Sequence, residues 1–451
     1  MSKNFTVENG QATAKKPIFN KKIISWCLWD LGGASFNSVV TTFVFTVYLT
    51  SKSFGDNAYT SQALGNGFTV AGFLIAALAP LTGQRADKEG KGTFWLGVNS
   101  FIVVISIFAL FFVKPHPSYL WYGIIILSLG NIFFEFASVN YNAMLTRIST
   151  PKNIGLISGV GWGSGYIGGI VLLLILFVGF ISPEVGWFGV TSAQGLNIRV
   201  SMLIAGIWML LATIPVLLFV RYKKNVVSDS KGLNIIQSYK DIWKTLKSIA
   251  HNCPQTIIFM AASAVFRDGL AGVFTFGAVI AAGTFGFTNQ QVIIFGIIAN
   301  VVAGIATMIF GLLDDWLGPK CVMMISLISM CISGVCVFIF AGHGQVYFWI
   351  FGLILCIFVG PTQSASRSYL ARMIPEGKEG EIFGLYATTG RAVSFLAPAG
   401  FTLFIWFARD YVKSDYAQSW GILGIVLVLL LGLLILLFVH DDPRSGNKKL
   451  L

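Results

Sequence analysis

The chain has 451 residues, of which 55% are hydrophobic and 11% are charged, and its formal net charge is +12. A soluble domain carries roughly 25% charged residues, so this composition excludes an ordinary soluble protein and indicates an integral membrane protein. The first 22 residues are polar and basic and do not resemble a cleaved signal. None of the six cysteines has metal-ligand spacing, so we expect neither a metal site nor a disulfide.

A membrane-spanning helix requires about 20 mainly apolar residues, and the sequence contains twelve such segments. In chain order they cover residues 23–50, 62–82, 93–113, 119–145, 154–181, 199–220, 256–283, 289–313, 319–341, 345–372, 380–407 and 418–440. The long connection at 221–255 separates six spans from six. The predicted organisation is therefore a tail (1–22), a six-helix bundle (23–220), a linker (221–255), a second six-helix bundle (256–440) and a second tail (441–451).

Within the linker, residues 234–251 have the pattern of an amphipathic helix. Apolar positions fall near one face and lysines on another, namely Ile235, Ile236, Tyr239, Ile242, Trp243, Leu246 and Ile249 against Lys240, Lys244 and Lys247. Such a helix suits the surface of a membrane, and a solvated linker helix accounts for the pattern equally well.

The basic residues indicate the topology. Of the 31 lysines and arginines, 23 lie in the tails and loops on the side of the termini, five lie on the other side, and three lie within spans. The positive-inside rule therefore places both termini and the linker in the cytoplasm, and we expect a multi-pass protein of a bacterial inner membrane. The basic charge also favours contact with anionic lipid, and its placement does not indicate a nucleic-acid partner.

Two short charged stretches half a chain apart repeat one pattern, Gly-x-x-x-Asp-x-x-Gly. Their residues are Gly83, Asp87 and Gly90, and Gly311, Asp315 and Gly318, at an offset of 228 residues. We expect each to form a tight loop between spans. A second pair of stretches, beginning at Leu145 and Leu370, repeats at an offset of 225. Together they indicate an internal duplication of six spans, as in many transporter folds.

The twelve spans, the long middle loop and the repeated motif resemble the major facilitator superfamily. Other stretches resemble its vacuolar-effluxer-like branch, also called the unknown major facilitator family. They are Ser25-Trp-Cys-Leu-Trp-Asp30, Ser35-Phe-Asn-Ser38, Tyr141-Asn-Ala-Met-Leu145, Gly159-Val-Gly-Trp-Gly-Ser-Gly-Tyr-Ile-Gly-Gly169, Arg267-Asp-Gly269, Ser364-Ala-Ser-Arg-Ser368 and Ser394-Phe-Leu-Ala-Pro398. The resemblance implies an all-α membrane protein whose twelve transmembrane helices form two six-helix pseudo-repeats.

The resemblance also implies roles for the spans. Spans 1, 4, 7 and 10 would line a central cavity, and spans 2, 5, 8 and 11 would form the gates, with Asp87 holding the cytoplasmic side shut against a neighbouring helix end. This chain departs from the superfamily pattern at Arg85, Gly92 and Trp316. Because Trp316 interrupts the second motif, we expect Asp315 to contribute less than Asp87. Yeast members of the branch are associated with amino-acid export from the vacuole, while bacterial members mostly lack an assigned substrate.

Six ionisable residues fall within the spans, and these are Asp30, Glu135, Arg267, Asp268, Arg367 and Arg391. A charge facing lipid near the membrane centre costs about 2.5–3.5 kcal/mol, so we expect these groups to face the bundle interior, to pair or to lie near headgroups. Asp268 is the acid nearest the midplane and the first candidate for proton coupling, with Glu135 as the alternative. Arg367 lies nearer the cytoplasmic end, where it could snorkel. The alternative for all six is structural ion pairing between helices.

Polar and small residues extend these helical faces. Asn37 shares a face with Asp30, Asn142 with Glu135, and Thr275 with Asp268, which suits either a wet cavity or interhelical hydrogen bonds. Span 5 carries a helix-packing stripe of Gly161, Gly165 and Gly169. Small residues at this spacing let helices approach closely, either in a sliding contact between the two halves or in static packing.

These features predict a secondary active transporter that moves a small solute by alternating access, and not an enzyme. The sequence has no phosphate-binding Gly-x-x-x-x-Gly-Lys-Ser/Thr loop, so we expect neither ATP drive nor a cofactor. Arginines could hold a carboxylate, and Asp268 or Glu135 an ammonium group or a proton. An amino acid or small peptide-like zwitterion is the expected substrate, with protons or another ion as the coupling partner. The alternatives are an organic anion or other solute, and a receptor or scaffold that does not transport. We expect a monomer in contact with membrane lipids.

Overall fold

The computed structural model describes residues 5–8, 11–14, 19–220, 235–375, 377–413 and 416–440, and it is almost entirely helical. The first half contains α1 (Lys21–Ala34), α2 (Phe45–Leu49), α3 (Asn57–Glu89), α4 (Gly92–Leu110), α5 (Leu120–Ile148), α6 (Ile154–Leu176) and α7 (Leu196–Phe219). The linker contributes α8 (Ile235–Asn252). The second half contains α9 (Pro254–Phe285), α10 (Asn289–Leu317), α11 (Pro319–Ile339), α12 (Gln345–Met373), α13 (Glu379–Ala392), α14 (Leu396–Phe407) and α15 (Trp420–Leu437).

Short elements complete the described chain. An antiparallel hairpin in the predicted N-terminal tail pairs β1 (Phe5–Glu8) with β2 (Gln11–Ala14), with Phe5 opposite Ala14. Segments of π-helix cover Ser35–Phe43, Phe177–Ile181 and Ala408–Val412, and 3₁₀ turns cover Pro117–Tyr119, Trp187–Gly189, Ala193–Gly195 and Ala417–Ser419. The hairpin was not expected from the sequence.

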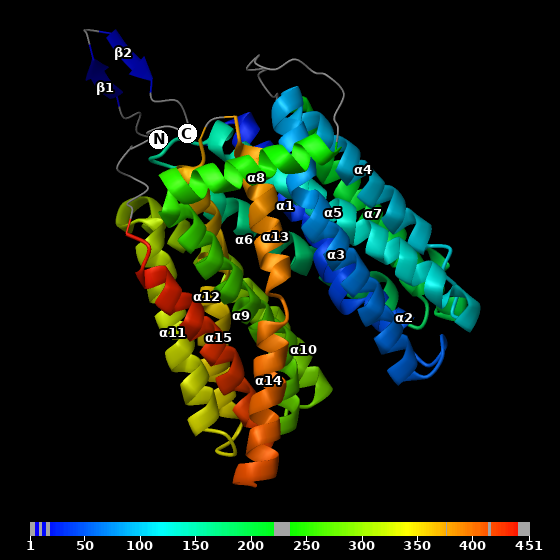
Figure 1. Cartoon of the computed structure of the whole chain (residues 1–451). Helices are drawn as coiled ribbons and strands as arrows, with labels where there is room; N and C mark the ends of the chain where they lie inside the picture. Colours follow the sequence, from blue (N-terminus) through cyan, green and yellow to red (C-terminus); the bar gives the residue numbers. More distant parts are fainter. Residues whose placement is uncertain are drawn as a thin grey trace.

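The helices form the predicted twelve-span fold in two halves. In the described residues, eleven helical segments are long and apolar enough to cross a membrane. The remaining span runs from Lys21 to Leu49, where the π-helical segment Ser35–Phe43 joins α1 to α2 and interrupts the regular α-helix. The N-half (α1–α7) and the C-half (α9–α15) each pack mainly among their own helices, and Figure 1 shows them as two groups.

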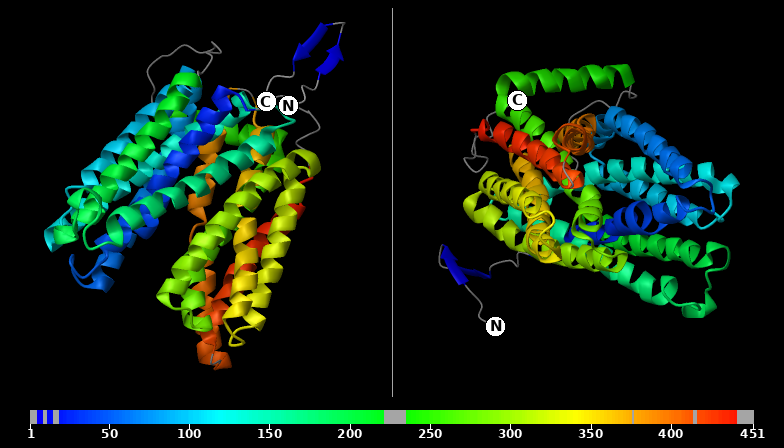
Figure 2. Two further views of the ribbon diagram at one scale, coloured as in Figure 1. Left: turned by 180° about the vertical axis from the view of Figure 1, so that it is seen from behind. Right: turned by 90° about the horizontal axis from the view of Figure 1, so that it is seen from below.

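The two halves meet at one end of the molecule and diverge toward the other (Figures 1 and 2). We call the meeting end, where α1 begins and α15 ends, the closed end. Two helix pairs cross between the halves there, α3 with α13 and α6 with α10. Glycines permit the contact, since a Cβ added to Gly83 would lie 1.9 Å from the carbonyl oxygen of Gly380. A Cβ added to Gly159 would likewise lie 2.7 Å from the carbonyl oxygen of Thr307.

The repeated charged motifs are mainly helical, which corrects the expectation of tight loops. Gly83 and Asp87 lie in the last turns of α3, and the turn follows at Gly90, whose φ is +61°. Similarly, α10 continues to Leu317 and ends at Gly318, whose φ is +96°. The helices extend because only the final glycine of each motif adopts the left-handed backbone that stops a helix.

The glycine stripe predicted in span 5 packs within the N-half. A Cβ added to Gly161 would lie 2.5 Å from the ring of Trp26, and one added to Gly169 would lie 2.7 Å from the hydroxyl of Ser38. A Cβ added to Gly165 would lie 3.5 Å from the carbonyl oxygen of Asp30. The stripe therefore lets α6 approach span 1, while Gly159, on another face of α6, lies at the contact between the halves.

Candidate functional site

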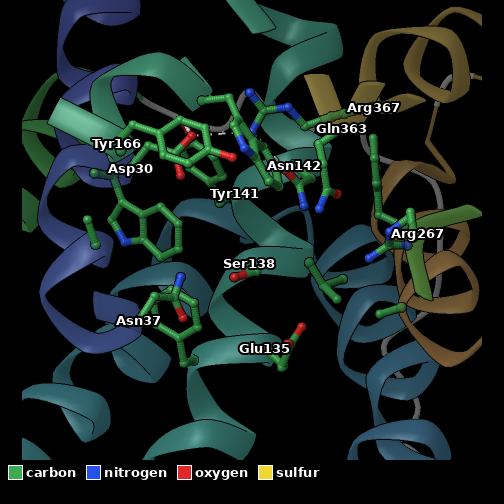
Figure 3. A pocket seen from close by; sticks show the side chains of 18 of the residues that line it. Asp30, Asn37, Glu135, Ser138, Tyr141, Asn142, Tyr166, Arg267, Gln363 and Arg367 are labelled. Atoms are coloured by element: carbon green, nitrogen blue, oxygen red, sulfur yellow. Dashed lines mark hydrogen bonds and ion pairs between the residues drawn. The ribbon is translucent and has the colours of Figure 1, made fainter. Parts of the chain in front are cut away.

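A cavity of about 360 Å³ lies between the halves, away from the closed end, and polar and aromatic side chains line it (Figure 3). The N-half contributes Trp29, Asp30, Asn37, Ser38, Phe134, Glu135, Ser138, Tyr141, Asn142, Trp162 and Tyr166, and the C-half contributes Arg267, Asn300, Gln363, Arg367, Phe383 and Tyr386, among others. Because both halves supply the wall, any movement between them changes the cavity.

Arg367, on α12, joins the two halves at the cavity wall. Its Nε donates to the Ser158 hydroxyl at 3.0 Å, and its Nη2 donates to the Ser158 carbonyl at 2.6 Å. Its Nη1 faces Asn142 Oδ1 at 3.3 Å and Asp30 Oδ2 at 3.4 Å. Within the described chain, every hydrogen bond of this C-half guanidinium therefore reaches an N-half residue.

Aromatic rings surround this arginine. Tyr141 stacks between Trp26 and Trp29, with ring centroids 4.3 Å apart in both pairs. The Arg367 guanidinium lies 4.9 Å from the Trp26 ring centroid and 5.1 Å from that of Trp162. Cation–π contacts of this kind hold an arginine in a place where water is scarce. The arrangement explains how a charged side chain that is 3% exposed is tolerated inside the bundle.

Asp30 is the acidic partner of this cluster, and it remains accessible from the cavity. Its Oδ2 accepts a hydrogen bond from the Tyr141 hydroxyl at 3.0 Å in addition to the contact with Arg367. The Asp30 side chain is 21% exposed. Asp30 therefore pairs with Arg367 and also lines the cavity.

A second ion pair crosses between the halves. Arg391 Nη2, on α13, donates to Glu135 Oε1 of α5 at 2.5 Å. Both side chains are partly exposed, and Glu135 lines the cavity while Arg391 stands outside its lining. The two acids of the cavity wall are thus each paired with an arginine from the opposite half.

Arg267 differs from the other two arginines. It lies over the ring of Tyr386, at 4.1 Å from the centroid, and its Nη1 donates to the Tyr386 carbonyl at 3.3 Å. Among the residues that the structure describes, no carboxylate lies within ion-pair distance of Arg267. Among the described residues, three guanidinium groups therefore stand against two carboxylates around the cavity, and Arg267 is the one without an acidic partner.

Asp268 lies outside the cavity lining and has a structural partner. The backbone N–H of Ala397 donates to its Oδ2 at 2.6 Å, and the side chain is buried. Ala397 lies in the first turn of α14, which begins after span 11 breaks at residues 393–395. Asp268 therefore accepts a hydrogen bond from the start of α14, and its negative charge interacts favourably with the positive end of the helix dipole there. Among the described residues, Asp268 takes part in no ion pair, which was the structural alternative for it, and it does not line the cavity.

The closed end is held by a repeated arrangement of acids and helix starts. Asp87 Oδ2, at the end of α3, accepts the Glu381 N–H of α13 at 2.9 Å. Asp315, at the end of α10, accepts the N–H groups of Gly155 and Leu156 at 2.7 and 2.8 Å. Each acid thus binds the N-terminus of a helix from the opposite half, where the dipole favours a negative charge.

Arginines add to both contacts. Arg372 donates to Asp314 at 2.5 Å and to Asp315 at 2.8 Å, and Arg147 donates to Glu379 at 3.2 Å. Trp316, which interrupts the second motif, points outward and is 77% exposed. The interruption therefore leaves the contacts of Asp315 intact, and the reason for expecting Asp315 to matter less than Asp87 is absent from the structure.

The sequence profile of the "vacuole effluxer Atg22 like" family matches residues 46–444. The chain belongs to this family. The resemblance to the vacuolar-effluxer-like branch of the major facilitator superfamily is thereby confirmed.

Similar proteins agree with the family assignment. The uncharacterized MFS-type transporter YxiO of Bacillus subtilis is 26% identical over 431 residues, which cover 95% of this chain and 96% of that protein. Autophagy-related protein 22-1 of Neosartorya fischeri is 24% identical over 332 residues, and the match spans about half of its length, 51%. The chain is thus a multi-pass membrane protein of a transporter family.

Solved structures of major facilitator transporters share the fold. The proton:xylose symporter XylE has a TM-score of 0.68 at 14% identity, with 93% of this chain and 96% of that chain covered. A bacterial homologue of the iron transporter ferroportin in an outward-facing state has a TM-score of 0.66 at 15% identity, with 93% and 98% covered. At these identities the likeness concerns the fold alone.

Most of the polar residues that the sequence analysis singled out lie together at one site. Asp30, Asn37, Glu135, Asn142 and Arg267 all line the cavity. Arg391 reaches it only through Glu135, and Asp268 and Thr275 do not contribute to its lining.

Sequence reasoning allowed the Arg367 side chain to snorkel toward the surface, whereas it is buried between the halves. It also missed four polar residues in or beside the cavity wall. These are Ser158, Tyr166, Asn300 and Gln363. The available signal for Arg367 was the run of serines around it, Ser364, Ser366 and Ser368, which mark a buried polar surface on α12.

Proposed function

We propose that the chain is a secondary active transporter of a small solute that carries a carboxylate, with an amino acid or small peptide-like zwitterion as its substrate. The observation that carries this proposal is Arg267, a cavity arginine without a carboxylate partner in the described residues, beside two acids that are already paired. A substrate carboxylate would balance that charge with a planar, two-pronged hydrogen bond. The substrate ammonium group would lie toward Glu135 or Asp30.

Alternating access follows from how the halves are joined. The contacts at the closed end are hydrogen bonds and ion pairs between halves, so they can be exchanged for water when the halves rock apart. If the termini are cytoplasmic, as the basic residues predict, the described state is closed to the cytoplasm and open outward. Opening the closed end would separate Arg367 from Ser158, Asn142 and Asp30 together.

Proton coupling would use the same separation. A nearby guanidinium favours the charged carboxylate, so its removal favours the protonated form. Asp30 would therefore hold its proton differently in the two states, and Glu135, which pairs with Arg391, is the second proton site. Asp268 is no longer the first candidate, because it caps a helix away from the cavity.

A ligand screen with matched compounds tests the proposal. The purified protein is heated with an amino acid, with its decarboxylated amine and with its deaminated acid, and sugars and nucleosides serve as unrelated controls. We expect stabilisation by the amino acid alone among the three, and loss of this effect in Arg267→Gln. Because binding to the folded state raises the melting temperature by mass action, the shift reports affinity directly.

The remaining outcomes separate the alternatives. Equal stabilisation by the deaminated acid would favour an organic-anion transporter, which the excess of guanidinium groups around the cavity also suits. Stabilisation by sugars or nucleosides only would reject a carboxylate substrate. If no compound class stabilises the protein, a receptor or scaffold with this fold becomes the better interpretation.

A further inference from the structure

Helix α8 lies along the outside of the bundle at the closed end and runs across the direction of the spans (Figures 1 and 2). It packs against α3 of the N-half and α9 of the C-half. The predicted amphipathic helix is thus present, but its apolar face is split. Ile242 and Ile249 are buried against the protein, whereas Ile236 and Trp243 are 67% and 68% exposed.

The exposed surface of α8 has two neighbouring faces of different chemistry. Ile236, Tyr239 and Trp243 form an apolar face beside the buried one. Next around the helix, Lys240, Lys244 and Lys247 form a basic face. In the part of the chain that the structure describes, these three lysines take part in no ion pair. Around its circumference, α8 therefore has a face buried against the protein, then an apolar face and then a basic face. This arrangement suits a helix in the interface of an anionic bilayer.

The same helix is connected to both halves. The Tyr239 hydroxyl donates to the Ala77 carbonyl of α3 at 2.8 Å, and Asp241 pairs with Lys88 of α3 at 2.9 Å. From the C-half, Lys378, just before α13, donates to the Thr245 hydroxyl at 3.0 Å. Since α3 and α13 form one of the contacts that shut the closed end, α8 bridges a junction that must part when this end opens.

We propose that α8 docks on anionic lipid headgroups and that this docking stabilises the state in which the closed end is shut. Lys240, Lys244 and Lys247 bind the headgroups, and Ile236 and Trp243 enter the apolar edge of the leaflet. A helix held flat by lipid across α3 and the start of α13 favours the arrangement in which both of its attachments are made. The Lys88 hydrogen bond holds the pKa of Asp241 below its usual range, so the attachment to α3 would persist in mildly acidic conditions as well as at neutral pH.

Two spin labels on α8 test the docking. On a background in which the native cysteines are replaced, a label at Ala250, on the apolar face, is compared with one at Gln237, on the far side of the basic face. In phosphatidylcholine nanodiscs that contain phosphatidylglycerol, we expect oxygen to relax the Ala250 label and a water-soluble nickel complex to relax the Gln237 label. Equal access of the nickel complex to both labels would overturn the docking.

A distance measurement tests the effect on the conformation without any substrate. Labels at Lys152 and His440, which lie in different halves at the closed end, report its opening by double electron–electron resonance. Phosphatidylglycerol should increase the population of molecules in which the two labels are close together. Each Lys→Gln change at 240, 244 and 247 should reduce this effect of phosphatidylglycerol about fivefold at low salt. The matched control, K52Q/K114Q/K413Q at the other end of the spans, should respond as the parent protein does.

Asp241→Asn separates the two parts of the proposal. It weakens the attachment to Lys88 and leaves the three lysines in place, so the Ala250 label should remain in lipid while the short-distance population responds less to phosphatidylglycerol. A lipid response of the distances that is the same in the triple glutamine variant and in its control would reject the proposal.

Discussion

At the scale of single residues, the charged groups inside the bundle divide into those that join the halves and those that support one half. Arg367 belongs to the first class, because its hydrogen bonds in the described chain all cross to the N-half. Asp268 belongs to the second, because it binds the start of α14 within the C-half. The sequence alone could not separate them, since both appear as charges in apolar spans and differ only in what the fold places opposite.

Arg367→Gln should open the closed end. The variant removes the guanidinium group that donates hydrogen bonds to Ser158, Asn142 and Asp30. Removing one partner of a buried ionic network typically costs about 3–5 kcal/mol. We expect the long-distance population between labels at Lys152 and His440 to become dominant. Arg367→Lys should have an intermediate effect, because an ammonium group keeps the charge but cannot make all the hydrogen bonds of the planar guanidinium. Arg409→Gln, at an exposed pair, is the control, and an unchanged distance distribution in Arg367→Gln would contradict its inter-half role.

Asp268→Asn should leave stability and gradient-driven uptake near those of the parent protein, since the asparagine Oδ1 can still accept the Ala397 N–H. Asp268→Ala leaves the buried Ala397 N–H without its acceptor and should lower the free energy of unfolding by about 1–3 kcal/mol. Thermal unfolding of the purified variants, together with uptake once a substrate is found, measures both effects. Loss of gradient-driven uptake in a normally stable Asp268→Asn would instead return this acid to the coupling mechanism.

At the scale of elements, the order of the helices could be predicted from apolar runs, and the linker helix at 234–251 agrees with α8 to within a residue at each end. Their lengths were predicted less well, since α3 covers Asn57–Glu89 where a span at 62–82 was expected. The positions of the turns in the charged motifs could not be predicted, because the sequence indicates a break at Gly83 whereas α3 continues through it. The interruptions of spans 1 and 11 were also missed. A π-helical segment and a three-residue break leave the apolar pattern almost unchanged, so composition alone does not reveal them.

The two acids at the closed end should be of similar importance. Asp87→Asn and Asp315→Asn each replace a carboxylate at the N-terminus of a helix from the other half, a contact worth up to about 2 kcal/mol where it is partly buried. We expect each variant to raise the open-to-closed ratio between the Lys152 and His440 labels by five- to thirtyfold at most. Asp410→Asn, remote from this contact, should not change the ratio. A strong effect of Asp87→Asn with none of Asp315→Asn would restore the unequal roles expected from Trp316.

At the scale of the whole molecule, the fold and its internal repeat could be predicted from twelve apolar runs and two offsets near half the chain. The conformational state could not, because the residues that shut one end serve equally in a protein open at that end. The composition of the cavity was predicted in large part, through Asp30, Asn37, Glu135, Asn142 and Arg267. Its pairing pattern depends on which residues from the two halves face each other, and that required the structure.

The topology predicts which positions are reachable from outside an intact cell. Single cysteines at Phe188, between α6 and α7, and at His343, between α11 and α12, should react with a membrane-impermeant maleimide, as should others in the loops near residues 51–61 and 408–413. These connections lie at the end of the spans away from α8. Cysteines at Lys152 and His440 should react only after the cells are opened. Outside labelling at Lys152 in intact cells would reverse the orientation of the whole molecule and make the described state inward-open.

The contact between Gly83 and Gly380 offers a practical way to reach the opposite conformation. With an added Cβ only 1.9 Å from a backbone carbonyl, one methyl group at this position is incompatible with the junction of α3 and α13. Gly83→Ala should therefore act as a wedge that populates the alternate state without altering any charge or any residue of the cavity. Samples trapped by so small a change would let the unseen half of the cycle be imaged, and binders raised against them would distinguish the two states in a living cell.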